Sequence, residues 1–416
     1  MRLAVILNFL MFLCAMYTYA QLQETEPPTY IKTIYFKGNS AQSQLPVLRL
    51  GEPITLEFDV LNAEEDDYYY KIKHFNADWT PSVLAQMEYL SGYDNQRIRN
   101  YQNSFNTYEM YSHYKLSIPN NQTRGLKVSG NYMIFIYDSD DNLVFSRKFM
   151  IHENSVDVNL KIKRSRDVKF IQQKQRVDIE VSSSRIQFLN PIMQVKALII
   201  QNNNLKTAIS GIPPQYTIGN KLIYRYDNET SFWGGNEYFY FENKDVRAAN
   251  IGIRYIELKD LYHNILYTNI PRVNSVYTYN PDINGNFAVL NIDAENSDIE
   301  ADYVWVHFSL GDATHLKDKN IHVYGNFNNY NVNNETLMTY DEDKGMFINK
   351  MLLKQGFYNY KYVVSDKDNI VDEGIVSGNF YQTENNYKVL IYYREVGDRY
   401  DRIVGFGENN SVNITN

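Results

Sequence analysis

The stretch NYMIFIYDSDDNLVFSRKFMI, from Asn131 to Ile151, holds two runs rich in β-branched and aromatic residues. Between the runs lie Asp138, Asp140 and Asn142, residue types that favour tight turns because their short polar side chains bond to the nearby backbone. An apolar run, a polar turn and a second apolar run together predict a β-hairpin. The acidic turn also invites comparison with a calcium loop, which is considered below.

Short strand-like runs follow one another along the rest of the chain. Examples are ITLEFDVL, from Ile54 to Leu61, and VKALII, from Val195 to Ile200. Tyr (37 residues) and Phe (21 residues) are abundant, and the helical period is almost absent. The sequence therefore predicts an all-β protein. One short helix is predicted over PSVLAQMEYL, residues 81–90, with Pro81 at its first position.

The first twenty residues, MRLAVILNFLMFLCAMYTYA, combine Arg2, an apolar run and a small-residue exit at Ala20, which is typical of a cleaved secretory signal peptide. Cys14 is the single cysteine, so the mature chain is expected to form no disulfide and no thiolate metal site. No later run reaches the length of a membrane helix. The net charge of −8 and the absence of a Lys/Arg cluster argue against a nucleic-acid partner.

The length of 416 residues exceeds what one sandwich core can hold, so three domains of sandwich size are expected. We predict a signal peptide over residues 1–20 and β-sandwich domains over 27–153, 154–275 and 276–396. A polar tail, expected to be loose, would follow over 397–416.

Motifs that carry chemistry are weak throughout the chain. The Asp138 turn lacks the glycine and the bidentate glutamate of a calcium loop, so it is interpreted as a plain hairpin tip, as is the turn at Asp341. The seven histidines form no HExxH and no other compact ligand spacing. GFGENN, from Gly405, has Asn410 where a dinucleotide loop needs its third glycine. We therefore expect no metal, no cofactor and no catalytic residue.

A glycoside hydrolase remains an open alternative, because the acids Asp227, Glu229, Glu237 and Glu242 flank the aromatic segment SFWGGNEYFYF. Hydrolysis of glycosides requires two carboxyl groups at a defined separation, and the sequence does not reveal such a pair.

Aromatic residues at predicted loops and strand ends are the candidate partner-binding groups: Trp79, Phe232, Trp233 and Tyr330. Flat rings offer a large contact area at small entropic cost to sugars or to protein partners. The alternative for each is a lid over the end of a sandwich.

The segment GNFNNY, from Gly325 to Tyr330, followed by a strand pair and GFYNYKYVV, resembles the early-Set immunoglobulin-like modules of glycogen-binding and branching-enzyme proteins. Those modules stack glucan on a tryptophan, where this chain has Tyr330. The resemblance implies immunoglobulin-like sandwiches arranged in tandem, and it leaves a carbohydrate-binding periplasmic or surface protein as the alternative function. In the scaffold interpretation, Phe327 fills the sandwich core and Gly325 permits a tight turn.

A wider set of segments covers nearly the whole mature chain. It includes KIKHFNADWTPS (Lys71 to Ser82), FWGGNEYFYFENKDVRAANIGI (Phe232 to Ile253), DYVWVHFSL and TENNYKVLIYYR. In this order the segments resemble the plug proteins of the type IX secretion system translocon, a family found in Bacteroidota.

The resemblance implies a non-enzymatic role in protein secretion and translocon gating. Such a protein would sit in the periplasm at the inner face of the outer membrane, as one copy in the complex. It would occlude the periplasmic opening of the large outer-membrane translocon barrel when no cargo is engaged, and so prevent leakage.

Overall fold

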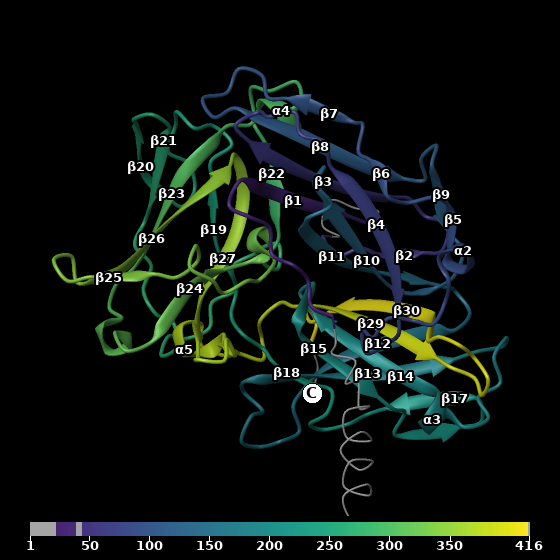
Figure 1. Cartoon of the computed structure of the whole chain (residues 1–416). Coiled ribbons are helices and arrows are strands. Elements are labelled where there is room, and N and C mark those ends of the chain that lie inside the picture. Colours follow the sequence, from purple (N-terminus) through teal and green to yellow (C-terminus); the bar gives the residue numbers. More distant parts are fainter. Residues whose placement is uncertain (1–21, 39–43, 415–416) are drawn as a thin grey trace, which may run out of the picture.

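The computed structural model describes residues 22–38 and 44–414, and the predicted signal peptide lies outside these residues. The protein is all-β, as predicted, and its strands form three sandwiches that meet as three lobes around a common centre (Figure 1). In the described part of the chain, no helix is long and apolar enough to cross a membrane.

The first sandwich packs the sheet β1-β3-β8-β7 against the sheet β2-β11-β10-β4-β6, with a small β5-β9 ribbon at one end. The predicted hairpin of the opening stretch is confirmed, because β10 and β11 pair in antiparallel register from Gly130↔Ile151 onward. The strands are Ile31–Lys37, Val47–Arg49, Ile54–Leu61, Tyr69–Phe75, Leu90–Gly92, Gln96–Arg97, Tyr101–Asn103, Tyr111–Ile118, Thr123–Leu126, Gly130–Tyr137 and Leu143–His152 (β1 to β11).

The second sandwich packs β12-β13-β17-β16, with β18 paired to β13, against β15-β14-β29-β30. Val177, Ile199 and Val389 from the two sheets meet in its core. The strands are Asp157–Arg164, Lys174–Ser182, Val195–Gln201, Asn204–Ile212, Tyr216–Ile218, Lys221–Tyr224 and Ser231–Trp233 (β12 to β18), with Asn386–Tyr393 (β29) and Arg402–Asn410 (β30).

The third sandwich is inserted between β18 and β29 of the second. It packs β19, β22, β24 and β28, all paired to β27, against β20-β21-β23-β26-β25. The strands are Phe239–Glu242, Ile253–Leu258, Tyr262–Leu266, Phe287–Val289, Tyr303–Leu310, Asn320–Tyr324, Thr339–Asp341, Met346–Lys354, Gly356–Ser365 and Val371–Asp372 (β19 to β28). The helices of the described chain are single turns: Gln86–Tyr89 (α2), Pro191–Gln194 (α3), Ser297–Glu300 (α4), Gly374–Ser377 (α5), Thr314–Leu316 (η1) and Asn326–Asn328 (η2).

The domain limits differ from those predicted. The sequence predicts residues 386–393 in the third domain and 397–416 in a tail, but β29 and β30 complete the second sandwich through the pairing Val195↔Tyr393 and the β29–β30 ladder. The glycines of the supposed tail serve this packing. A Cβ on Gly405 would lie 2.3 Å from the Val156 side chain, so only glycine lets β30 approach β12 this closely.

The predicted helix over 81–90 is also corrected. Only Gln86–Tyr89 is helical, whereas Pro81 forms a β-bridge with Phe75. The single turn begins after Ala85, whose backbone N–H donates to the Glu88 carboxylate at 2.7 Å. Pairing with the neighbouring strand overrides the local helical preference of the preceding residues.

The first and second sandwiches share an apolar interface between their sheets. Met133 and Met150, on the outer face of β10 and β11, pack with Leu198, Leu390 and Ile403 from the second sandwich. Strands buried on both faces read as continuous apolar runs, which explains why YMIFIY and VKALII lack alternation. The two sandwiches therefore form one continuous packed body.

Candidate functional site

The N-terminal segment crosses the region where the three sandwiches meet. Thr25 exchanges hydrogen bonds with Ser146 of β11, its N–H donating to Oγ at 2.8 Å and its carbonyl accepting from the Ser146 N–H at 3.2 Å. The Glu24 carboxylate accepts from the Lys148 N–H at 2.6 Å and from Asn329 Nδ2 of the third sandwich at 2.6 Å. This segment thus ties the first sandwich to the third.

A fully buried ion pair joins the same two sandwiches. Lys354 Nζ, at the end of β26, lies 2.7 Å from Asp59 Oδ2 of β3, and the two side chains are 1% and 0% exposed. Asp59 also accepts from Tyr303 OH at 2.6 Å and pairs with His113 Nδ1 at 2.7 Å. Burial acts to raise the pKa of Asp59, but Lys354 and His113 outweigh it and hold that pKa below its ordinary value.

Sequence reasoning missed this cluster, although one signal was present. In ITLEFDVL the apolar Leu56, Phe58 and Val60 face the core of the first sandwich, while Glu57 and Asp59 face the other way. Alternation of this kind normally marks a solvated face. Here the charged face is buried under the third sandwich, so its charges must be paired within the protein.

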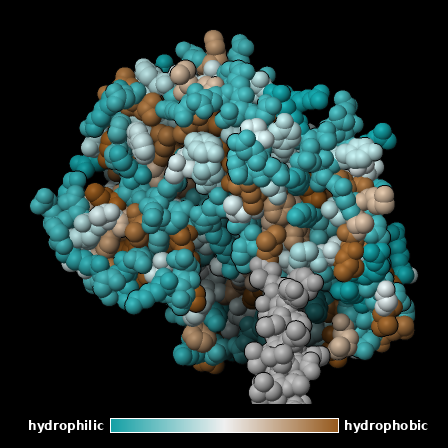
Figure 2. Space-filling view, in the orientation of Figure 1, coloured by the Kyte–Doolittle hydropathy of each residue, from teal (hydrophilic) through white to brown (hydrophobic). Residues whose placement is uncertain are grey.

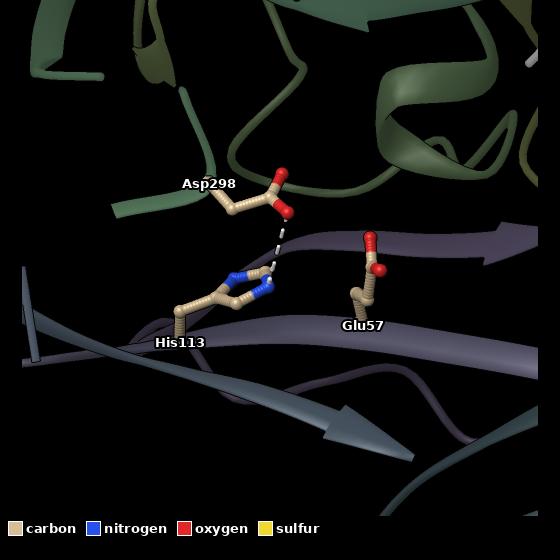
Figure 3. A group of neighbouring side chains, drawn as sticks. All are labelled: Glu57, His113 and Asp298. Carbon is tan, nitrogen blue, oxygen red and sulfur yellow. Dashed lines mark ion pairs between the residues drawn. The ribbon is translucent and has the colours of Figure 1, made fainter. Parts of the chain in front are cut away.

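Glu57, His113 and Asp298 lie together beside this pair, as Figure 3 shows, with their ligand atoms within 4.8 Å of one another. Glu57 and His113 project from the adjacent strands β3 and β8, and Asp298 comes from α4 of the third sandwich. Glu57 is already neutralised by Lys37 at 2.5 Å and Lys115 at 2.8 Å. A cation would have to displace both lysines, so the arrangement fits an ion-pair network rather than a metal centre.

Contacts between the second and third sandwiches include hydrogen bonds that involve buried tyrosine hydroxyls. Tyr330 OH donates to the Asn202 carbonyl at 2.8 Å, and Asn204 Nδ2 donates to Tyr324 OH at 2.8 Å. Between the first and second sandwiches, Arg402 pairs with Glu153 at 2.6 Å. Each pair of sandwiches is thus joined by several polar contacts.

The four predicted partner-binding aromatics do not form one surface. Trp79, Phe232 and Tyr330 are buried, at 5%, 5% and 2% exposure, and only Trp233 is exposed, at 46%. Trp233 lies against Phe170 and under the Lys174 ammonium, 4.4 Å from its ring centroid. Trp79 packs between the first and second sandwiches, Phe232 in the second core, and Tyr330 between the second and third sandwiches, so contacts within the chain already cover these three rings.

The glucan-platform interpretation of Gly325 to Tyr330 fails at Tyr330, whose ring is enclosed beside Tyr324. Phe327 is half-buried against the third core, in keeping with the scaffold interpretation. The role given to Gly325 is corrected: its backbone is extended, and a Cβ would lie 2.6 Å from the Phe327 ring and 2.8 Å from the Asn359 carbonyl. Close approach, and not a turn, requires this glycine.

Three acids of the hydrolase alternative have partners within the chain. Asp227 pairs with Arg176 at 2.9 Å, and Glu242 pairs with Lys244 at 2.6 Å. Glu237 is buried and accepts from Tyr277 OH at 2.5 Å, and burial raises its pKa to about 7. The Asp138 turn is a hairpin tip, in which Asp138 Oδ1 accepts the backbone N–H groups of the turn.

Comparison with known proteins identifies the group to which this architecture belongs. The family model described as "Type 9 secretion system plug protein 1st domain" matches residues 31–153, which hold strands β1 to β11 of the first sandwich. The first sandwich is therefore the first domain of a type 9 secretion system plug protein. The role of this plug-family protein is therefore that of a plug in type IX secretion.

A crystal structure of a hypothetical protein from Parabacteroides merdae resembles this plug-family chain along almost its whole length. The two are 30% identical, with a TM-score of 0.89, and the match covers 94% of this chain and 100% of the other. Among curated proteins there is no match. The three-sandwich arrangement, insertion included, is thus shared with a solved structure.

Proposed function

We propose that this protein closes the periplasmic opening of the outer-membrane translocon barrel of the type IX system when no cargo is engaged. A pore wide enough for folded cargo would otherwise leak solutes. A body that fills the opening stops flow by its bulk, since water and ions need continuous space to pass. Closure of this kind requires no bond-making chemistry, and we propose a non-enzymatic role.

The observation that supports this proposal most directly is the locking of the three sandwiches into one body. A string of independently moving domains would let a channel open between them. Domains of one chain move relative to one another unless the interface between them is large and apolar. Here the insertion of the third sandwich, the N-terminal segment and the buried Asp59–Lys354 pair oppose such motion. A stopper also has to leave its seat, which suits a largely polar surface.

Figure 2 shows that hydrophilic residues cover most of the visible face, with apolar residues scattered among them. A surface of this kind is typical of non-obligate contacts, in which hydrogen bonds and water share the interface. We propose that the protein resides in the periplasm, against the inner side of the outer membrane, and that its seat on the barrel is a contact of this reversible type.

The test is deletion of the gene, followed by measurement of outer-membrane permeability to a large antibiotic that the intact membrane excludes. We expect the deletion strain to become sensitive and the unaltered gene to restore resistance. Purification of a tagged copy from detergent extracts should recover a large outer-membrane protein. Unchanged permeability together with no such partner would refute the proposal.

A pair of variants sharpens this test. Lys354→Met removes the buried pair that fixes the first sandwich to the third, whereas Lys317→Met removes an exposed pair with Glu342 on the surface. We expect Lys317→Met to restore the seal fully and Lys354→Met to restore it only in part at matched protein levels. Equal sealing by the two variants would argue against rigidity as the basis of closure.

A further inference from the structure

A cavity of about 460 Å³ lies where the three sandwiches meet. It is lined by the N-terminal segment and β1, by Arg147 and Lys148 of β11, by residues 203–206 of the second sandwich, and by residues 326–331 of the third. Its volume falls in the range of small-molecule sites in proteins, which are mostly apolar with a few polar groups that fix the ligand. Apolar walls come from Ile34, Leu205 and Phe287.

Arg147 is the polar group that the fold does not account for. Its side chain is 91% buried, with 9% exposed, and it extends from the same face of β11 as the core residues Phe145 and Phe149. Its one hydrogen bond is from Nη1 to the carbonyl of the adjacent Ser146, at 2.8 Å. Its guanidinium carbon lies 5.5 Å from the centroid of the Phe145 ring, and within the described chain no carboxylate lies at ion-pair distance from it, although a buried guanidinium normally has such a partner.

Among the lysines that line the same cavity, Lys148 and Lys206 form no ion pair with a described residue. The ammonium of Lys148, which is 8% exposed, lies 4.4 Å from the centroid of the Trp79 ring. Lys206 reaches solvent and donates to Asn331 Oδ1. Two carboxylates, Glu24 and Glu26, also line the cavity and favour the charged forms of Arg147 and Lys206, while Glu24 itself accepts hydrogen bonds from backbone and amide groups. Positive charge at the cavity is therefore only partly balanced.

We propose that this cavity binds an amphipathic anion, an alkyl chain that carries a carboxylate or a phosphate group. The charged group would bind to the Arg147 guanidinium, which is suited to bidentate pairing with either anion. Lys206 would add a second, solvent-exposed contact, and the alkyl chain would lie along the apolar walls. A ligand at this place would contact all three sandwiches at once and strengthen their association.

The test is calorimetric titration of the full mature chain with dodecanoate and dodecyl phosphate, each below its micellar concentration, beside neutral dodecanol and the short anion acetate. We expect one site for one or both long anions, and at least tenfold weaker binding of dodecanol and acetate. The two long anions distinguish a carboxylate from a phosphate headgroup. Failure of both to bind, or equal binding of dodecanol, would overturn the proposal.

Arg147→Gln should weaken binding of the long anion at least tenfold, because it removes the charged hydrogen-bond donor. Arg225→Gln, at an exposed arginine, is the matched control and should leave binding unchanged. Lys206→Met, at an exposed position, should weaken binding several-fold and serves if the Arg147 variant does not fold. Binding that is insensitive to both cavity variants would place the ligand elsewhere and overturn the assignment.

Discussion

Removal of the Lys354 ammonium is the sharpest test of how the first and third sandwiches are held together. Lys354→Met keeps an unbranched stem but leaves the carboxylate of Asp59 without its cation. Asp59 would retain only the hydrogen bonds from His113 and Tyr303. Breaking a buried pair from one side costs about 3–5 kcal/mol, because one charge remains uncompensated in a medium that solvates it poorly. We expect a loss of that size in the free energy of unfolding.

The assay is urea unfolding of the full mature chain, followed by tryptophan fluorescence and circular dichroism. Lys317→Met, at an exposed pair 2.7 Å from Glu342, is the control and should cost less than about 1 kcal/mol. The double variant Asp59→Asn, Lys354→Met should recover part of the loss, because neither charge is then buried alone. A loss below about 1 kcal/mol for Lys354→Met, or a double variant less stable than the single one, would refute the reasoning.

Three further predictions concern single residues. Burial lowers the pKa of His74 from 6.5 to about 4, so the unfolding free energy should fall by about 3 kcal/mol as the pH drops from 6.5 to 4. His74→Phe should remove this pH dependence from acid-unfolding curves. An unchanged pH dependence would exclude His74 as its source. Burial raises the pKa of Glu237 from 4.5 to about 7, so its protonated form stabilises the fold at low pH and that stability is lost as the pH rises through 7. Glu237→Gln should therefore raise the unfolding free energy by roughly 3 kcal/mol at pH 8 and leave it nearly unchanged below about pH 4, and a destabilised variant at pH 8 would contradict this. Gly405→Ala should lower the thermal midpoint by forcing β30 away from Val156, at a cost of about 1–3 kcal/mol, and a midpoint equal to that of the parent would mean that the strands can separate freely.

Much of the candidate site was invisible to sequence reasoning for one physical reason. An aromatic side chain at a loop is exposed or buried depending on which distant segment packs over it. Tyr330 follows a predicted turn, yet it is buried and its hydroxyl bonds to Asn202 of another sandwich. The same holds for Asp59, whose charge looks like part of a solvated face until the third sandwich covers it. Local chemistry was correctly inferred where the partners were local, as at the Asp138 turn.

The sequence by itself determined the strands, the hairpins and the all-β class, because these depend on alternation and on turn residues within a few positions of one another. Only the tertiary structure decided that β29 pairs with β14 across the inserted third sandwich, and that β30 joins the same sheet through β29. The entropic cost of closing a loop rises slowly with its length, so a strand can pair across an entire inserted domain when the partner face is apolar and complementary. The locking of three sandwiches into one body follows from that choice.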